Sequence, residues 1–214
     1  MIHPSLGADA LNDLQNNMPI SSSIINYFCS KLRTKFKDQP KSFYFMEPNI
    51  SSLIYDKSVE FSRDFMKSRN VKSNDMVFIF LYHNSHFSLL CYMPKMKKHC
   101  FVHLDSIKNY HHQYAIDFTN KFINIFEVKC NPKTAFAELG CPQQNNDYDC
   151  GIYSIAFVDL IASNFNFSKN VFEAITPTYI TKLRGELWRT IISEQTQINI
   201  EIPCAQFSPQ VDQS

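Results

Sequence analysis

The chain lacks a surplus of charge of either sign. Its 214 residues include 21 Lys and Arg against 20 Asp and Glu, which gives a formal net charge of +1. Domains that bind nucleic acid usually carry a strongly basic face or stripe. We therefore expect no nucleic-acid partner.

A secretory leader and long apolar runs are also missing. The first residues, MIHPSLGADALNDLQNNMP, have neither the basic start nor the apolar centre of a signal peptide. No apolar run reaches the length that a bilayer span needs, and the sequence contains no repeats or low-complexity segments. These absences predict a soluble protein of the cytoplasm, the nucleus or both, without membrane contacts.

The seven cysteines form no CxxC pair, and their number is odd. A disulfide framework or a zinc ribbon is therefore disfavoured, and reduced, mostly buried thiols are expected. One cluster, His99, Cys100 and His103, contains residue types that zinc binds. A regular strand would place Cys100 on the face opposite both histidines. We therefore expect neither a metal site nor a cofactor.

Length and patterning predict a single α+β domain over residues 1–196, with a flexible tail over 197–214. We expect the protein to be a monomer. Apolar runs predict strands, whereas apolar residues at helical spacing with capping residues predict helices. The expected strands cover residues 43–46, 76–82, 87–92, 100–104 and 134–138. The expected helices cover 23–36, 51–67, 110–126 and 150–162, and a last one is capped by Thr176 and starts at Pro177.

Cys150 differs from the other cysteines in its expected position. It follows the loop CPQQNNDYD and opens a helix that is apolar nearly all round, with Asp149 as the expected cap. Unpaired backbone N–H groups and the helix dipole favour an anion at this end of a helix. The thiolate is the nucleophilic form of cysteine. Cys150 is thus the candidate nucleophile, with a structural thiol as the alternative.

A cysteine nucleophile needs a base, which is usually histidine. His86 is the leading candidate among seven histidines, because it lies where a short turn enters the strand FSLLCY. His103 falls inside a strand and is expected to be a hydrogen-bonded core residue. His111 and His112 begin a helix and are expected to face solvent.

Two further polar residues could complete such a site. Asp105 ends the strand next to that of His86, so its carboxylate could accept the second imidazole N–H and orient the ring. Alternatively, Asp105 merely begins a turn. Gln144 has an amide that could donate to a developing oxyanion, although a glutamine in a polar loop is more often simply solvated.

Three segments in combination carry a resemblance to a known family. HFSLL at 86–90, HLDS at 103–106 and PQQNNDYDCGIY at 142–153 resemble the signature of the ubiquitin-like-protein-specific proteases, the sentrin-specific protease class. The resemblance spans about residues 20–195 and leaves 1–20 poorly matched. It implies a papain-like fold, in which a small mixed sheet packs against helices and the nucleophile heads a central helix.

The same resemblance implies roles for individual residues. Cys150, His86 and Asp105 would form the catalytic triad, and Gln144 would help to hold the oxyanion. Phe87 stands where the class usually has a tryptophan that covers the substrate's Gly-Gly, so Phe87 is expected to contact the substrate. A second usual tryptophan is replaced by Pro19.

Within the class, residues 176–188 are similar to the matching segment of the deneddylases. This likeness implies a thiol protease that cleaves after the C-terminal Gly-Gly of the Nedd/Rub modifier. Its substrates would be the modifier's precursor and its conjugates, such as neddylated cullins. A SUMO- or ubiquitin-directed protease, an acyltransferase and a modifier-binding pseudoenzyme remain as alternatives.

Overall fold

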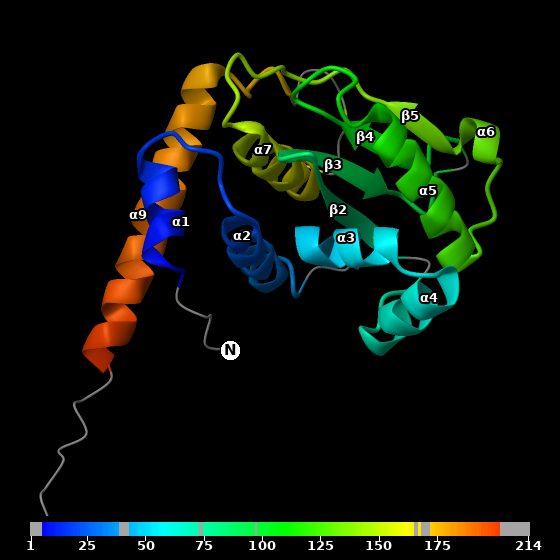
Figure 1. Cartoon of the computed structure of the whole chain (residues 1–214), viewed down its shortest axis with the longest axis horizontal. Helices are drawn as coiled ribbons and strands as arrows, with labels where there is room; N and C mark the ends of the chain where they lie inside the picture. Colours follow the sequence, from blue (N-terminus) through cyan, green and yellow to red (C-terminus); the bar gives the residue numbers. More distant parts are fainter. Residues whose placement is uncertain are drawn as a thin grey trace, which may run out of the picture.

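The structure, a computed structural model, describes residues 6–38, 43–72, 75–96, 98–164, 167 and 172–201. A mixed five-stranded sheet lies at its centre (Figure 1). In spatial order the strands are β1 (Phe43–Met46), β2 (Met76–His83), β3 (His86–Tyr92), β4 (Phe101–Leu104) and β5 (Phe136–Glu138). β3 runs antiparallel to its neighbours β2 and β4, whereas β1 pairs in parallel with β2 and β5 pairs in parallel with β4.

Helices cover both faces of the sheet, because its central strands are apolar on both sides. Phe78 and Phe80 face a core shared with α1 (Ala8–Gln15), α2 (Ser22–Lys35), α7 (Cys150–Asn164) and α9 (Pro177–Glu201). Ile79 and Leu81, which alternate with them, face a second core shared with α3 (Pro48–Asp56), α4 (Val59–Ser68) and α5 (His112–Phe126). Figure 1 shows α1 beside the long helix α9, on the α7 side of the molecule.

The predicted α+β architecture and the five predicted strands are confirmed, with one change at β5. That strand begins at Phe136, two residues later than expected, because a short helix α6 (Pro132–Ala135) precedes it. The side chain of Asn131 caps this helix by accepting the N–H of Lys133 at 3.0 Å. A proline at the first helical position is compatible with a helix start.

The single helix predicted over residues 51–67 is wrong, because the chain forms α3 and α4 there. Lys57 is extended, and the hydroxyl of Ser58 accepts the N–H of Phe61 at 3.2 Å, which starts a new helix. The buried hydroxyl of Ser51 donates to the carbonyl of Phe80 on β2 at 2.6 Å. The cap at Ser58 and this anchor to the sheet outweigh the continuous apolar spacing.

The last helix starts as predicted. The hydroxyl of Thr176 accepts the N–H of Tyr179 at 3.2 Å, and Pro177 is the first helical residue. α9 continues to Glu201, into the segment expected to be a tail, and residues 202–214 lie outside the described part.

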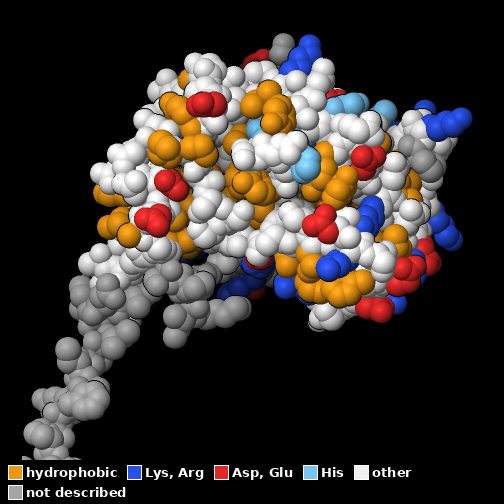
Figure 2. Space-filling model, in the orientation of Figure 1, with side chains coloured by type: hydrophobic (Ala, Val, Ile, Leu, Met, Phe, Trp, Pro, Cys, Tyr) orange, Lys and Arg blue, Asp and Glu red, His pale blue; other side chains and the backbone are white. Residues whose placement is uncertain are grey.

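The surface carries both signs of charge. On the face drawn in Figure 2, basic and acidic side chains lie among one another, and apolar side chains are spread between polar atoms. Over the described ranges, no helix is both long enough and apolar enough to cross a membrane.

Candidate active site

A tight turn places His86 at one end of the sheet. Asn84 and Ser85 both have positive φ, 47° and 58°, and the flanking His83 and His86 are paired across the turn. Two consecutive left-handed residues are the conformation of the commonest two-residue hairpin turn. His86 is therefore the first residue of β3, and its side chain is 4% exposed.

The end of β4 brings a carboxylate to this histidine. β4 runs antiparallel to β3, so Asp105, which follows Leu104, lies beside the start of β3. Oδ1 of Asp105 is 2.7 Å from Nε2 of His86 and also accepts the N–H of Ile107 at 3.0 Å. Oδ2 accepts the N–H of His111 at 2.9 Å. Both carboxylate oxygens are thus held, and the pair is buried.

Cys150 heads α7 directly beside this pair. Its thiol is close enough to His86 to raise the pKa of that histidine, and the residue is 3% exposed. The next residue, Gly151, allows the close packing: a Cβ there would lie 2.5 Å from Cγ1 of Ile20 and 3.3 Å from a ring carbon of Phe87. The structure therefore brings together the three residues that the sequence singled out for a triad.

The hydrogen bonds favour the charged forms of His86 and Asp105. Burial alone would lower the pKa of His86, but the hydrogen bonds to Asp105 and Cys150 and the negative charges of both raise it to about 9. Burial alone would raise the pKa of Asp105, but the hydrogen bonds from His86, Ile107 and His111 lower it below its usual value. At neutral pH the arrangement therefore suits an imidazolium at His86 beside the carboxylate of Asp105.

Asp149 precedes α7 as predicted, but its carboxylate does not serve the expected capping role. Its Oδ1 accepts Nε and Nη2 of Arg184 at 3.0 and 2.8 Å, and its Oδ2 accepts the side-chain amide of Asn146 at 2.8 Å. The backbone carbonyl of Asp149 accepts the N–H of Tyr153, as at the start of a helix. An ion pair from α9 thus fixes the residue in front of Cys150.

Gln144 lies on the loop that leads to Cys150. Its backbone N–H donates to the carbonyl of Ser106, and its side-chain oxygen accepts the Ser106 hydroxyl at 2.7 Å. Its amide nitrogen donates to the carbonyl of Asn146 at 2.6 Å. A shallow depression of about 610 Å³ runs along residues 106–108 and 143–147. These contacts fix the orientation of the carboxamide.

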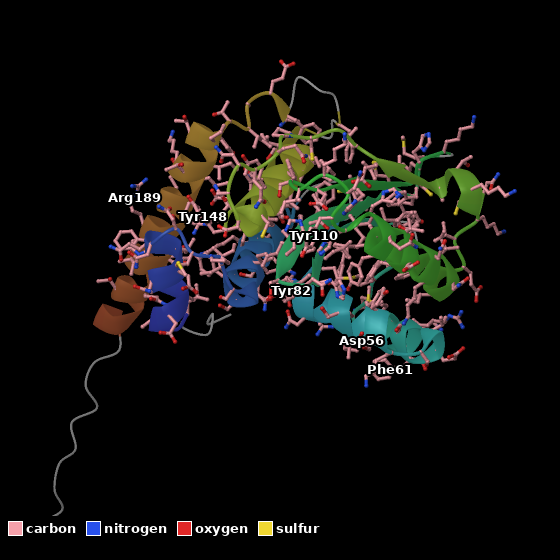
Figure 3. The ribbon with its side chains drawn as sticks, turned by 45° about the horizontal axis from the view of Figure 1, so that its top comes forward. Asp56, Phe61, Tyr82, Tyr110, Tyr148 and Arg189 are labelled. Atoms are coloured by element: carbon pink, nitrogen blue, oxygen red, sulfur yellow. The ribbon has the colours of Figure 1, made fainter. Side chains whose placement is uncertain are left out.

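Aromatic side chains surround the histidine and the turn before it. Phe87 is 3% exposed and lies 4.5 Å, ring to ring, from Tyr82. Tyr110 lies edge-on to His86 at 4.8 Å and donates its hydroxyl to the carbonyl of Asn84 at 3.2 Å. Figure 3 labels Tyr82 and Tyr110 over the central part of the molecule, and Tyr148 toward α1 and α9. The exposed Tyr82 and Tyr110 are site neighbours that the sequence reasoning missed.

The expectation that His111 faces solvent is wrong. The residue is 1% exposed, its Nε2 lies 2.9 Å from the carbonyl of His83, and its Nδ1 lies 2.8 Å from Oγ of Ser88. α5 begins one residue later, at His112, whose side chain is 45% exposed. His103 is the hydrogen-bonded core residue that the sequence predicted, with Glu138 and Ser88 as partners.

The side chains at this site that could bind a metal ion already form hydrogen bonds within the protein. Ligand atoms of His86, Asp105 and His111 lie within 4.8 Å of one another. Each of these side chains already bonds to protein groups. Both ring nitrogens of His103, from the cluster considered for zinc, are engaged as well. We assign no metal to either set.

Comparisons with known proteins agree on one family. The family model described as "Ulp1 protease family, C-terminal catalytic domain" matches residues 9–195. Sentrin-specific protease 8 of Homo sapiens is 30% identical over 171 residues, which cover 75% of this chain and 78% of the relative. NEDD8-specific protease 1 of Arabidopsis thaliana is 26% identical, covering 86% and 78%.

A solved structure shows the same fold. The SUMO protease Ulp1, with its catalytic cysteine oxidised to a sulfenic acid, superimposes with a TM-score of 0.71. The superposition covers 89% of this chain and 84% of that structure, at 18% sequence identity.

Proposed function

The chain belongs to the Ulp1 protease family and is a cysteine protease of the class that acts on ubiquitin-like proteins; we propose that its modifier is of the Nedd8 type. The relative named NEDD8-specific protease 1 and the likeness of residues 176–188 to the deneddylases support this choice. The substrates would be the modifier's precursor and its conjugates, such as neddylated cullins, in the cytoplasm or nucleus.

The buried His86–Asp105 pair beside Cys150 is the observation that supports the chemistry most strongly. His86 takes the thiol proton of Cys150, and the resulting thiolate attacks the carbonyl carbon of the modifier's last glycine. His86 then gives its proton to the leaving amine, and a thioester remains on Cys150. Water, which loses a proton to His86, hydrolyses the thioester and releases the modifier.

Asp105 has an orienting role in this scheme. Its carboxylate accepts the Nε2–H of His86 at 2.7 Å, which leaves the other ring nitrogen to exchange a proton with the thiol. Backbone N–H groups of Ile107 and His111 hold the carboxylate in place. The carboxylate thus fixes the tautomer and the direction of the ring.

Gln144 would supply an oxyanion donor together with the backbone N–H of Cys150. A carboxamide nitrogen carries two N–H groups, and the hydrogen bond to the carbonyl of Asn146 uses one of them. The hydroxyl of Ser106 fixes the amide by donating to its oxygen. We therefore assign the second N–H to the oxyanion.

Replacing Gln144 with alanine should lower kcat by about a hundredfold to a thousandfold, because one oxyanion donor is lost. KM should stay close to that of the wild type, since the donor acts mainly in the transition state. Steady-state hydrolysis of a modifier with a fluorogenic C-terminal leaving group measures both constants. Asn145→Ala, at an exposed position of the same loop, is the matched control. Equal losses in the two variants would remove Gln144 from this role.

The choice of modifier is tested by covalent labelling. We would incubate the reduced protein with Nedd8, SUMO and ubiquitin, each carrying a C-terminal electrophile, and follow adducts by mass spectrometry. Nedd8 should form a one-to-one adduct with the wild type and with Cys130→Ala, but not with Cys150→Ala.

Each other outcome has a definite meaning. Labelling of Cys150 by SUMO or ubiquitin alone would keep the chemistry and overturn the modifier. Adducts that persist in Cys150→Ala would overturn the nucleophile. A folded wild type that forms no adduct with any of the three would favour a pseudoenzyme that only binds a modifier.

A further inference from the structure

A continuous chain of hydrogen bonds, buried at its centre, runs from the candidate active site to the far edge of the sheet. It starts at the carbonyl of His83, passes through His111, Ser88 and His103, and ends at the carboxylate of Glu138 on β5. The successive distances are 2.9, 2.8, 2.9 and 3.0 Å. We call His111, Ser88, His103 and Glu138 the histidine chain; its three members other than Glu138 are buried.

The two ends of the chain fix the outer protons. A backbone carbonyl and an ionised carboxylate can only accept hydrogen bonds. Nε2 of His111, which faces the carbonyl of His83, must therefore carry a proton. Nδ1 of His103, which faces both oxygens of Glu138 at 3.0 Å, must carry one as well. The hydrogen bonds of Glu138 with His103 and His112 lower its pKa against the opposing effect of burial, so it is ionised at neutral pH.

The middle of the chain then lacks one proton if both imidazoles are neutral. The inner nitrogens, Nδ1 of His111 and Nε2 of His103, would both be acceptors, and the Ser88 hydroxyl has a single proton to give. One of the two short contacts would place two lone pairs against each other in a buried site. One additional proton satisfies every member of the chain.

We propose that this additional proton resides on His103 as a buried imidazolium balanced by Glu138, and that it keeps His111 as a neutral positioning residue for the His86–Asp105 pair. In this arrangement His103 donates to Ser88, and the Ser88 hydroxyl donates to Nδ1 of His111. Both carboxylate oxygens of Glu138 lie 3.0 Å from Nδ1 of His103, so the carboxylate balances the positive charge of the imidazolium.

The surroundings of His111 explain why the charge belongs at the other end. Its ring faces those of His83 on β2 and His86 on β3, and those of Tyr110 and Tyr114 on either side of the start of α5. Asp105 accepts its backbone N–H. The ring of His86 is 4.7 Å away, centre to centre. Burial and the neighbouring histidine charges lower the pKa of His111 to about 4, against the opposing effects of the His83 carbonyl and Asp105.

A neutral His111 benefits the proposed chemistry, on which this inference rests. An imidazolium at His86 is needed beside the thiolate, and a second positive charge next to it would disfavour that form. The neutral ring instead braces three elements: it bonds to the end of β2 and to Ser88 on β3, while its backbone holds Asp105. The catalytic pair is thereby fixed without competition for its proton.

Nitrogen NMR of histidine side chains in the reduced wild-type protein tests the protonation pattern directly. We would label histidine with ¹⁵N, assign the peaks with single His→Gln variants, and record long-range ¹H–¹⁵N spectra at neutral pH. His103 should show two protonated nitrogens, and His111 should show the neutral form with its proton on Nε2. A neutral His103, or a doubly protonated His111, would overturn the proposal. This readout does not depend on protease activity.

Kinetics test the positioning role. Glu138→Gln removes the balancing charge, so His103 should lose its second proton, which the NMR spectra would show. The histidine chain should then lose one hydrogen bond. We expect kcat to fall about tenfold to a hundredfold through misplacement of the pair, with KM changed less than twofold. His112→Gln, which removes the exposed second partner of Glu138, should leave both constants near wild type.

The outcomes separate this inference from the proposed function. Wild-type kinetics in a Glu138→Gln variant whose His103 has become neutral would show that the histidine chain does not position the His86–Asp105 pair. A wild type without turnover on any modifier, but with the expected NMR pattern, would overturn the proposed function and leave the protonation of the chain intact.

Discussion

Asp105→Asn is expected to lower kcat/KM by about four orders of magnitude, because an amide cannot hold the histidine in the same tautomer. The carboxylate accepts the Nε2–H of His86 at 2.7 Å. An asparagine can turn its NH₂ toward this nitrogen, which moves the ring proton to the nitrogen that faces Cys150. Hydrolysis of a fluorogenic modifier substrate, with folding verified by circular dichroism, gives the comparison.

The same variant should change the pH dependence in a defined direction. The pKa of His86 is raised to about 9, so the imidazolium of the wild type is present below that pH and is lost as the pH rises through it. The wild-type kcat/KM should therefore fall on the alkaline side near pH 9. Removal of the Asp105 charge and its hydrogen bond lowers the pKa of His86, so the alkaline fall should move to lower pH.

A neighbouring aspartate provides the control for both effects. Asp117 is exposed on α5 and accepts a hydrogen bond from Gln113 one turn away. Asp117→Asn should retain the wild-type rate and pH profile. If Asp105→Asn kept more than a tenth of the wild-type kcat/KM, or the same alkaline limit, Asp105 would not be the residue that orients His86.

The sequence predicts those features that depend on neighbours along the chain. The apolar runs of β2, β3 and β4 predict buried strands, because a strand covered on both faces has few polar positions. The ends of these strands then place His86 and Asp105 side by side, as antiparallel pairing requires. The boundary at Ser58 was missed because a helix cap and continuous apolar spacing compete, and the spacing alone does not reveal which prevails.

The features that the sequence does not predict depend on contacts between distant residues. His111 is hydrophilic and lies at a helix start, and only its bonds to β2 and β3 explain its burial. Asp149 has the residue type and position of a helix cap, yet its carboxylate is taken by Arg184, 35 residues further along. Such partners become visible only when the elements are packed together.

Arg184→Ala is expected to lower the free energy of unfolding by about 3–5 kcal/mol, the usual cost of removing one partner from a buried ion pair. The side chains of Arg184 and Asp149 are 4% and 10% exposed. The guanidinium also donates to the carbonyls of Asp13, Met18 and Tyr148 at 3.0–3.2 Å. Its loss leaves these acceptors and a buried carboxylate without their donor. Urea unfolding followed by circular dichroism measures the change.

The same helix provides a matched control for this prediction. Lys182 forms a solvent-exposed pair with Glu186 at 3.6 Å, so Lys182→Ala should cost less than about 1 kcal/mol. A double variant of Arg184 and Asp149 should be less destabilised than the sum of the two single changes, because each single change leaves a charge without its partner. If Arg184→Ala were as mild as Lys182→Ala, the pair would not stabilise the fold. The surrounding apolar packing would then have to hold α1, the segment before α2 and the residue before Cys150 in place without Arg184.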